Sequence, residues 1–291
     1  MVYRDDRRYI SQLFKVESAV VEAIEDEIAD CSIDWHEPYP EYATPGLKVA
    51  VLSSPDGVDT NFSWGTKAKP VATPLLESLP ATMEFIDGLG FHIVSARLLR
   101  LDQGAFVYEH SDKKNEYSHY SPGSGRLRLH FPVATTSDAA LVLPGRAVHL
   151  KKGFLWKLNP TKAVHGSFNF GSVPRLHLIF DCLLNERLAR FIENEFLDHD
   201  CQIELSPLAL PEKVSLMEAA GSAAREGRLL EAEHIILSAF CKYNLSNLTS
   251  YDLLMEFIGK TPVLAHRMQF WQDRYAEAYP TRFVAPVLAV V

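Results

Sequence analysis

The 291-residue chain has little that would mark a secreted, membrane-embedded or nucleic-acid-binding protein. Four cysteines are present, none in a CxxC pair, so neither a disulfide framework nor a structural zinc site is expected. The net charge of -8 argues against nucleic acid as a partner, because phosphate binding needs a basic field. No apolar run approaches the roughly 18 residues of a membrane helix. The charged first residues lead into no hydrophobic segment, so we expect no signal peptide and a cytoplasmic protein.

What the chain does contain is typical of a globular protein, with 47% hydrophobic and 23% charged residues. Apolar and acidic positions alternate at helical spacing over residues 5–30, which predicts an amphipathic helix against a core. Residues 31–80 are rich in proline, glycine and serine, with short apolar runs such as Leu47–Val51. This second segment is consistent with strands and loops.

The central part of the chain, about residues 90–185, reads as short strands separated by turn signals. The expected strands are Phe91–Leu101, Gly104–Tyr108, Arg126–Val133, Ala139–Leu143, Ala147–Leu150, Phe154–Leu158 and Arg175–Cys182. Such a series predicts a sandwich or barrel, such as a jelly roll. The polar insertion at residues 113–125 is a candidate lid, and an ordinary solvated connection explains it equally well.

Beyond Pro207 the pattern becomes helical, with apolar stripes in Glu212–Arg225, Leu229–Tyr243, Ser250–Gly259 and Val263–Tyr279. Thr249 and Asp252 have the spacing of a capping box. We therefore predict a β domain over residues 1–205 and a helical region over 206–291. The helical region could pack on the β core or form the surface of a homodimer.

Metal-ligating residue types recur in an ordered set, His110-Ser-Asp112, then His165, then Arg175. If His110 and Asp112 lie on a strand, alternation puts both side chains on one face. Two imidazoles and one carboxylate form the facial triad of non-haem Fe(II) oxygenases, which leaves positions open for a co-substrate and O₂. An arginine on the next strand could hold the far carboxylate of that co-substrate. An HxD tripeptide alone is weak among 11 histidines, so the prediction rests on the whole set.

Two further pairs of polar residues lie on expected strands. Arg128 and His130 share one face of their strand, and the local pattern slightly favours solvated side chains opposite a leucine-rich core face. Their alternative role is to bind a carboxylate from within a barrel. Arg97 and Arg100 lie on opposite faces, so at most one of them points inward.

The stretch from Arg97 to Asp181 resembles the Fe(II)- and 2-oxoglutarate-dependent aspartyl/asparaginyl β-hydroxylase group, and within it the free L-proline hydroxylases (cis-3 and cis-4). The matching segments are Arg97–Arg100, His110–Asp112, Arg128–His130, Gly153–Asn159, His165 and Pro174–Asp181. The helical segment Ser250–Ile258 is also similar. The chain departs from the proline hydroxylases at Glu109, where they tend to have proline, and at Asn159, where they often have aspartate.

The resemblance implies a double-stranded β-helix (jelly-roll, cupin-like) core. It makes His110, Asp112 and His165 the iron ligands and Arg175 the anchor of 2-oxoglutarate. It also moves Arg128 and His130 to the inner face, where they would help hold 2-oxoglutarate or the substrate carboxylate. We expect the pair Arg97 and Arg128 to hold the substrate carboxylate.

The function expected from the resemblance is hydroxylation of an sp³ carbon in a free L-amino acid or an amino-acid-derived metabolite. The reaction would use Fe(II) as a cofactor, consume 2-oxoglutarate and O₂, and release succinate and CO₂. One alternative is a β-hydroxylase of Asp- or Asn-type residues in a peptide or on a carrier. Others are a zinc or nickel enzyme of cupin type and a non-catalytic cupin-like binding protein.

Overall fold

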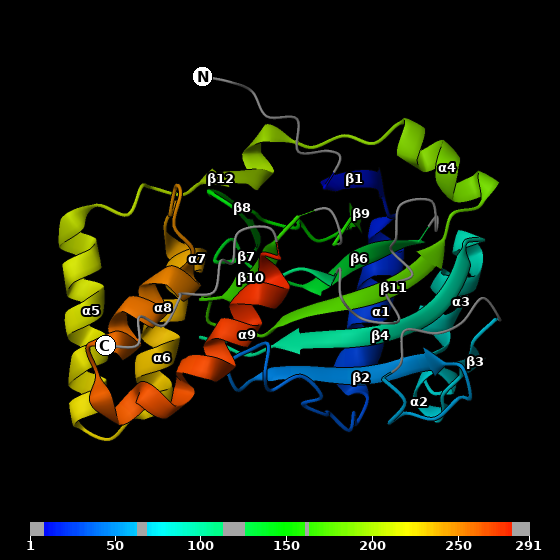
Figure 1. The fold of residues 1–291 in the computed structure, drawn as a ribbon. Helices are drawn as coiled ribbons and strands as arrows, with labels where there is room; N and C mark the ends of the chain where they lie inside the picture. Colours follow the sequence, from blue (N-terminus) through cyan, green and yellow to red (C-terminus); the bar gives the residue numbers. More distant parts are fainter. Residues whose placement is uncertain (1–8, 63–68, 113–125, 161–162, 281–291) are drawn as a thin grey trace.

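A computed structural model describes residues 9–62, 69–112, 126–160 and 163–280 of the chain. The predicted lid candidate at residues 113–125 lies outside these ranges. Figure 1 shows a β core flanked by two groups of helices, one early and one late in the sequence. None of the helices within the described ranges is long and apolar enough to cross a membrane.

In the described part of the chain, the larger of two sheets has seven strands in the order β1-β9-β6-β11-β4-β2-β3. In that order the strands span Ile10–Lys15, Phe154–Leu158, Arg126–Ala134, Arg175–Leu183, His92–Leu101, Leu47–Ser54 and Val71–Ala72. The second sheet has five strands in the order β12-β8-β7-β10-β5. These span Gln202–Glu204, Arg146–Val148, Ala139–Leu143, His165–Asn169 and Phe106–His110. Neighbouring strands in both sheets are antiparallel, and the result is the predicted cupin-like jelly roll.

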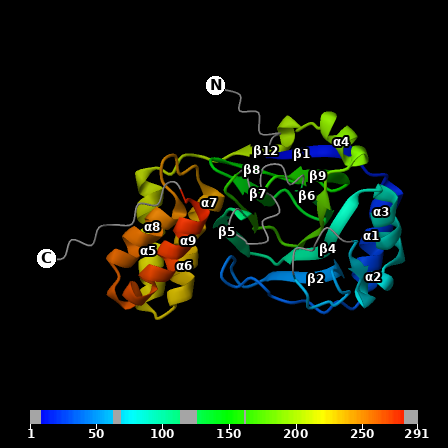
Figure 2. The same cartoon turned by 45° about the vertical axis from the view of Figure 1, so that its right-hand side comes forward.

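The outer face of the larger sheet is covered by helices α1 (Ser18–Asp30), α2 (Pro74–Glu77) and α3 (Pro80–Leu89), and Figure 2 shows these together at one side of the core. The predicted helix over residues 5–30 is wrong in its first half, because Ile10–Lys15 is a strand paired with β9. Ile10, Leu13 and Phe14 fit a helical stripe, but the edge of the sheet buries both faces of this segment. The helix α3 was not foreseen from the loop-like composition of its surroundings.

Helices late in the chain gather at the opposite end of the β core, as Figure 2 shows. They are α5 (Leu210–Arg225), α6 (Leu229–Leu237), α7 (Ala239–Lys242), α8 (Ser250–Gly259) and α9 (Met268–Ala278), with a short 3₁₀ turn at Pro262–Arg267. Helix α4 (Glu186–Glu193) lies apart from this group, beside β1 and on the side of the early helices, and a 3₁₀ turn at His199–Cys201 follows it. The capping box of Thr249 and Asp252 is confirmed. The predicted helix at Leu229–Tyr243 is broken at Ser238, and Val263–Tyr279 begins as a 3₁₀ turn.

The late helices and the smaller sheet share one hydrophobic cluster, in which Phe106, Tyr108, Val142 and Phe168 pack with residues of α5 to α9. Residues up to Glu204 still pair within this sheet, through β12. The helical region therefore packs on the β core, which is one of the two arrangements expected from the sequence. The division of the chain into domains near residue 205 stays a prediction.

Candidate active site

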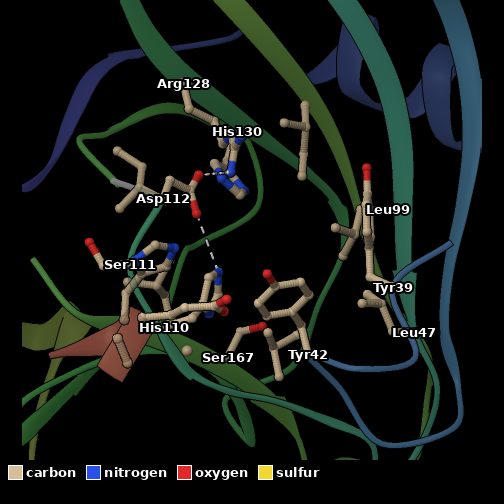
Figure 3. Close-up of a pocket in the computed structure, with 18 of the residues that line it drawn as sticks. Tyr39, Tyr42, Leu47, Leu99, His110, Ser111, Asp112, Arg128, His130 and Ser167 are labelled. Carbon is tan, nitrogen blue, oxygen red and sulfur yellow. Dashed lines mark hydrogen bonds and ion pairs between the residues drawn. The ribbon is translucent and has the colours of Figure 1, made fainter. Parts of the chain in front are cut away.

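A cavity of about 210 Å³ lies between the two sheets and contains the predicted site residues. The larger sheet contributes Arg97, Arg128, His130 and Arg175, and the smaller sheet contributes His110 and His165. Figure 3 shows Asp112 between Arg128 and His110, joined to each by a polar contact. A cavity of this size suits small molecules.

The three predicted metal ligands converge at one point. His110 is the last residue of β5, and it faces His165, the first residue of β10, across the strand pair. Asp112 lies just beyond the end of β5, and its Oδ1 is 3.4 Å from His110 Nε2. One ligand atom from each of the three residues lies within 4.8 Å of the others. Residues distant in sequence thus form a cluster that can hold a metal ion.

A β-bulge directs His110 into the cavity. Ser167 pairs with Val107 and His165 with His110, so Tyr108 and Glu109 together oppose the single residue Gly166. Because a bulge shifts the alternation of side chains by one, Tyr108 packs on the helices while His110 turns to the cavity. A Cβ at Gly166 would come within 2.7 Å of the Val107 carbonyl, so the bulge requires glycine at this position.

Both histidines present the nitrogen that a metal needs. Nδ1 of His110 lies 2.8 Å from the carbonyl of Tyr108, and Nδ1 of His165 lies 3.1 Å from the carbonyl of Ala163. A carbonyl only accepts, so each Nδ1 carries a proton, and in the neutral ring Nε2 then has the lone pair that a metal needs. Such backbone contacts fix the ring and tautomer of metal-binding histidines. The donor set, two neutral imidazoles and one carboxylate, fits Fe(II).

Asp112 is held ionised by its neighbours. Burial by itself would raise the pKa of this carboxyl, but the Arg128 guanidinium together with the His110 and His165 rings lowers it well below its usual range. Burial lowers the pKa of His165 to about 3, and the His110 ring adds to this effect. Both groups are therefore in the protonation states that bind a metal at neutral pH.

Asp181 links the arginines of the larger sheet. Its Oδ1 accepts from Nε of Arg128 at 3.1 Å and its Oδ2 accepts from Nη2 of Arg97 at 2.9 Å. Arg128 reaches on through Nη1 to Oδ2 of Asp112 at 3.0 Å. Asp181 is 1% exposed, so this is a buried chain of alternating charges that fixes the position of one predicted metal ligand. Its central member, Asp181, had been given no role from the sequence.

Arg175 is a buried cation without a carboxylate partner among the described residues. It is 2% exposed, it lines the cavity, and burial lowers its pKa to about 10. An arginine in this position is costly unless an anion compensates it. Its planar fork matches a carboxylate, so the far end of a dicarboxylate such as 2-oxoglutarate fits this residue.

His130 and His177 are neighbours of Arg175 on the same inner face. Their Nδ1 atoms lie 3.4 Å apart, and within the described structure neither Nε2 has a hydrogen-bond partner. Burial lowers the pKa of both rings well below the ordinary value of 6.5, and the charge of Arg175 adds to this. Of the two rings, His130 lines the cavity, so its Nε2 is a polar atom beside the buried guanidinium of Arg175 that a ligand can pair with.

Arg128 and His130 therefore face the cavity, and Leu129 and Phe131 pack under the early helices. The local pattern had favoured the opposite arrangement, with these two polar residues in solvent. The local pattern was misleading because the apolar face of this sheet packs against helices, whereas its polar face lines the cavity and not the solvent. Arg97 is buried and Arg100 points outward to Asp102, as alternation required.

Glu109, the residue at which the chain departs from the proline hydroxylases, joins β5 to the start of α8. Its Oε1 accepts from the backbone N–H and the hydroxyl of Ser250, at 2.7 and 2.6 Å. Its Oε2 accepts from the hydroxyl of Tyr279 at 2.7 Å, and its backbone carbonyl accepts from Tyr251. A carboxylate is favoured at a helix N-terminus. Glu109 thus fixes the helical region against the strand that carries His110.

The other end of the cavity was not foreseen from the sequence. It is lined by Tyr42 from the segment before β2, by Tyr251 of α8, and by Arg274 and Glu277 of α9. No local signal identifies these residues, because α9 comes more than a hundred residues after the metal-ligand pattern in the chain. The packing of the helices on the smaller sheet brings the residues of α8 and α9 to the cavity, and the Tyr42 carbonyl accepts from the backbone N–H of Tyr108 on β5.

Comparison with known proteins finds one matching family model. Residues 62–184 match the model of the aspartyl/asparaginyl beta-hydroxylase family. No curated protein matches the chain. The matched segment, less than half of the chain, includes the three predicted metal ligands, Arg175 and the buried charge chain.

Solved structures are similar at low sequence identity. An oxidoreductase of the 2OG-Fe(II) oxygenase family from Burkholderia pseudomallei is 13% identical, with a TM-score of 0.39, over 57% of this chain and 79% of that one. HygX from Streptomyces hygroscopicus, with nickel and 2-oxoglutarate bound, is 14% identical, with a TM-score of 0.37, over 59% and 80%. A "predicted oxalate decarboxylase" from Thermotoga maritima is 11% identical, with a TM-score of 0.30, over 54% and 96%. The family match therefore covers residues 62–184, a segment that lies within the two-sheet jelly-roll core.

Proposed function

We propose that this protein is an Fe(II)- and 2-oxoglutarate-dependent dioxygenase that hydroxylates an sp³ carbon of a free L-amino acid or an amino-acid-derived metabolite. The observation that carries the proposal is one cavity holding both halves of the required site. His110, Asp112 and His165 converge there, and a buried Arg175 without a described carboxylate partner lies beside them.

Each residue of the site would have a separate role. His110 Nε2, His165 Nε2 and the Asp112 carboxylate would hold Fe(II), and Arg175 would hold the far carboxylate of 2-oxoglutarate, with Arg128 and His130 beside it. When bound, the metal and co-substrate supply the oxidation, in which R–H, O₂ and 2-oxoglutarate give R–OH, succinate and CO₂.

The protein's own contribution is to position these groups and to exclude water. Arg128 donates to Asp112 and so fixes the carboxylate, while Asp181 fixes Arg128. Leu99, Leu141, Leu158 and Ile179 line the cavity between the polar groups, which favours a dry interior. A substrate held in a fixed orientation then presents one carbon for hydroxylation.

The test is a product search by mass spectrometry. Purified protein is incubated with Fe(II), 2-oxoglutarate and either free L-amino acids or peptides containing Asp and Asn. We expect a product heavier by one oxygen, about 16 mass units, from a free amino acid, together with equimolar succinate. Modification of the peptides alone would favour the β-hydroxylase alternative.

The variant Asp112→Ala separates an enzyme from a non-catalytic binding protein. Loss of outer contacts to a metal ligand already costs about 10- to 100-fold, so removal of the ligand should lower succinate formation by more than about 100-fold. Asp30→Ala, at the exposed end of α1, is the matched control. No succinate from the unmodified protein under any condition would overturn the proposal, and activity with zinc or nickel in place of iron would show a different cupin chemistry.

A further inference from the structure

One helix of the late group carries a pair of opposite charges into the cavity. Arg274 Nη2 donates to Glu277 Oε1 at 3.0 Å, three residues along α9, and both residues line the cavity. Their side chains are 19% and 33% exposed. The pair Arg228 and Glu231 has the same spacing at the start of α6, but its side chains are 44% and 52% exposed. The pair on α9 is therefore an ion pair facing a binding site.

Arg274 retains binding capacity for a ligand. Its guanidinium lies over the ring of Tyr42, with Cζ 5.1 Å from the ring centroid. Within the described structure its Nε is buried and has no hydrogen-bond partner. Because a guanidinium has five N–H donors, the contact with Glu277 leaves donors for an incoming carboxylate.

Glu277 has a distinctive place among the acidic residues of the site. Of the described residues that line the cavity, only Asp112 and Glu277 have carboxylates, and Asp112 belongs to the metal triad. A carboxylate has about four acceptor positions, of which Arg274 uses one. Glu277 is thus the lining group that can accept an ammonium ion.

The three arginines at the metal-ligand end of the cavity have other partners or another expected ligand. Arg97 and Arg128 are each bonded to Asp181, and Arg175 matches the far end of 2-oxoglutarate. Because Asp181 already balances charge on Arg97 and Arg128, we assign the substrate carboxylate to Arg274 in place of that pair, which was expected from the sequence. The Tyr42 ring lies 5.9 Å from the ring of His110, so a head group held on Tyr42 leaves its side chain within reach of the triad.

We propose that Arg274 and Glu277, with Tyr42 beneath them, bind the zwitterionic head of a free α-amino acid, Arg274 its carboxylate and Glu277 its ammonium. On a helix, residues three apart are about 5–6 Å apart at Cβ, a spacing that a single α-amino acid head can bridge. An internal peptide residue has neither charge. This proposal rests on the proposed function and defines the substrate class by its head group.

The first experiment changes the ligand and leaves the protein as it is. Free L-amino acids are titrated into the protein with Fe(II) and 2-oxoglutarate in the absence of O₂, and the tightest binder is compared with its N-acetyl derivative and its carboxamide. Each derivative removes one charge of the zwitterion. Because hydrogen bonds to charged groups are stronger than neutral ones, we expect Kd to rise about ten- to a hundredfold for each.

The second experiment changes the protein. Glu277→Gln should raise the Kd of the free amino acid by about tenfold and leave the Kd of its N-acetyl derivative unchanged, since that ligand has no ammonium to lose. Arg274→Gln should behave in the same way toward the free acid and the carboxamide. Glu231→Gln on α6 is the matched control, and it should leave every Kd within about twofold.

The outcomes separate this proposal from the proposed function. Succinate and hydroxylated product from a free amino acid, with N-acetyl and free forms bound equally well, would overturn the head-group site and leave the enzyme in place. A Glu277→Gln effect of equal size on both forms would also overturn it. Absence of succinate in the unmodified protein would instead count against the proposed function.

Discussion

The two faces of the seven-stranded sheet differ in chemistry, although the same strands form both. On the outer face, Leu98, Leu129, Phe131 and Phe180 are fully buried beneath the early helices. On the inner face, the alternate residues include Arg97, Arg128, Arg175 and Asp181, also buried, but around a cavity. Because side chains alternate along a strand, one residue stabilises the fold by packing against helices, while the next residue lies at the functional site.

This difference between the faces explains why a buried charge cluster can exist in this fold. Unpaired charges in an interior are costly, and here Asp181 pairs with two arginines while the apolar outer face stabilises the same strands. The comparison predicts that substitutions on the outer face lower stability with little effect on ligand binding. Substitutions on the inner face should do the reverse, with Asp181 as the exception that affects both.

The largest effect is expected on the outer face, at Phe180. This side chain is fully buried and packs near Phe85, with ring centroids 6.3 Å apart. Phe180→Ala should lower the free energy of unfolding by about 3–5 kcal/mol, and Phe180→Leu by less than about 1.5 kcal/mol. Urea unfolding measures both. A tenfold change in the Kd of 2-oxoglutarate for folded Phe180→Leu would break the separation of the two faces.

The next effect is expected at Asp181, the adjacent residue on the inner face. Asp181→Asn leaves Arg97 and Arg128 without their shared counter-charge and should lower the free energy of unfolding by about 3 kcal/mol. The exposed pair of Glu256 and Lys260 is the control, where Glu256→Gln should cost under about 1 kcal/mol. Equal unfolding midpoints for the two variants would contradict a structural role for the buried charge chain.

A somewhat smaller effect is expected at Arg175, and it should concern binding alone. Arg175→Gln removes the fork that holds the far carboxylate, so KM for 2-oxoglutarate should rise about 30-fold, corresponding to about 2 kcal/mol. Arg175→Lys should restore part of the loss because it keeps the charge. Arg100→Gln, on the adjacent strand β4 but facing outward, is the control. A KM unchanged in Arg175→Gln would remove the proposed anchor.

The smallest effect is a pH dependence from His177. Burial lowers its pKa well below 6.5, so the folded protein keeps the ring neutral while the unfolded chain protonates it. Below about pH 6.5 the unfolded state binds the extra proton, so stability falls as the pH falls, by up to about 1.4 kcal/mol per pH unit. His177→Gln should flatten this slope between pH 6.5 and 5, whereas the exposed His199→Gln should not. Parallel curves for His177→Gln and the unmodified protein would contradict the assignment.

Much of the fold could be predicted from the sequence, because periodicity survives in most elements. Strands such as Ala139–Leu143 and Phe154–Leu158, and the helix Ser250–Gly259, have the predicted bounds. The strand His165–Asn169 was not predicted, since a histidine, glycine, serine and asparagine around one phenylalanine give no apolar alternation. The strand Ile10–Lys15 was taken for helix, because its neighbours in the sheet, and not its own pattern, decide its state.

The metal-ligand end of the site was predictable because its residues lie in short segments at the ends of the strands β5, β10 and β11. His110, Asp112, His165 and Arg175 meet at the cavity as the spacing and the family resemblance implied. The bulge at Tyr108 and Glu109, the bridging role of Asp181 and the pair on α9 were not predictable. Each depends on a contact between segments that are distant in the chain, and no sequence period encodes such a contact.

The central claim is that a metal held by His110, Asp112 and His165 and a dicarboxylate held by Arg175 occupy one cavity. Calorimetric titration of 2-oxoglutarate into the protein, without O₂ and with or without Fe(II), tests it most directly. We predict one 2-oxoglutarate per chain that binds only when iron is present, with binding lost in Asp112→Ala and weakened about 30-fold in Arg175→Gln. Binding of equal affinity with and without iron, or unchanged in Asp112→Ala, would contradict the account.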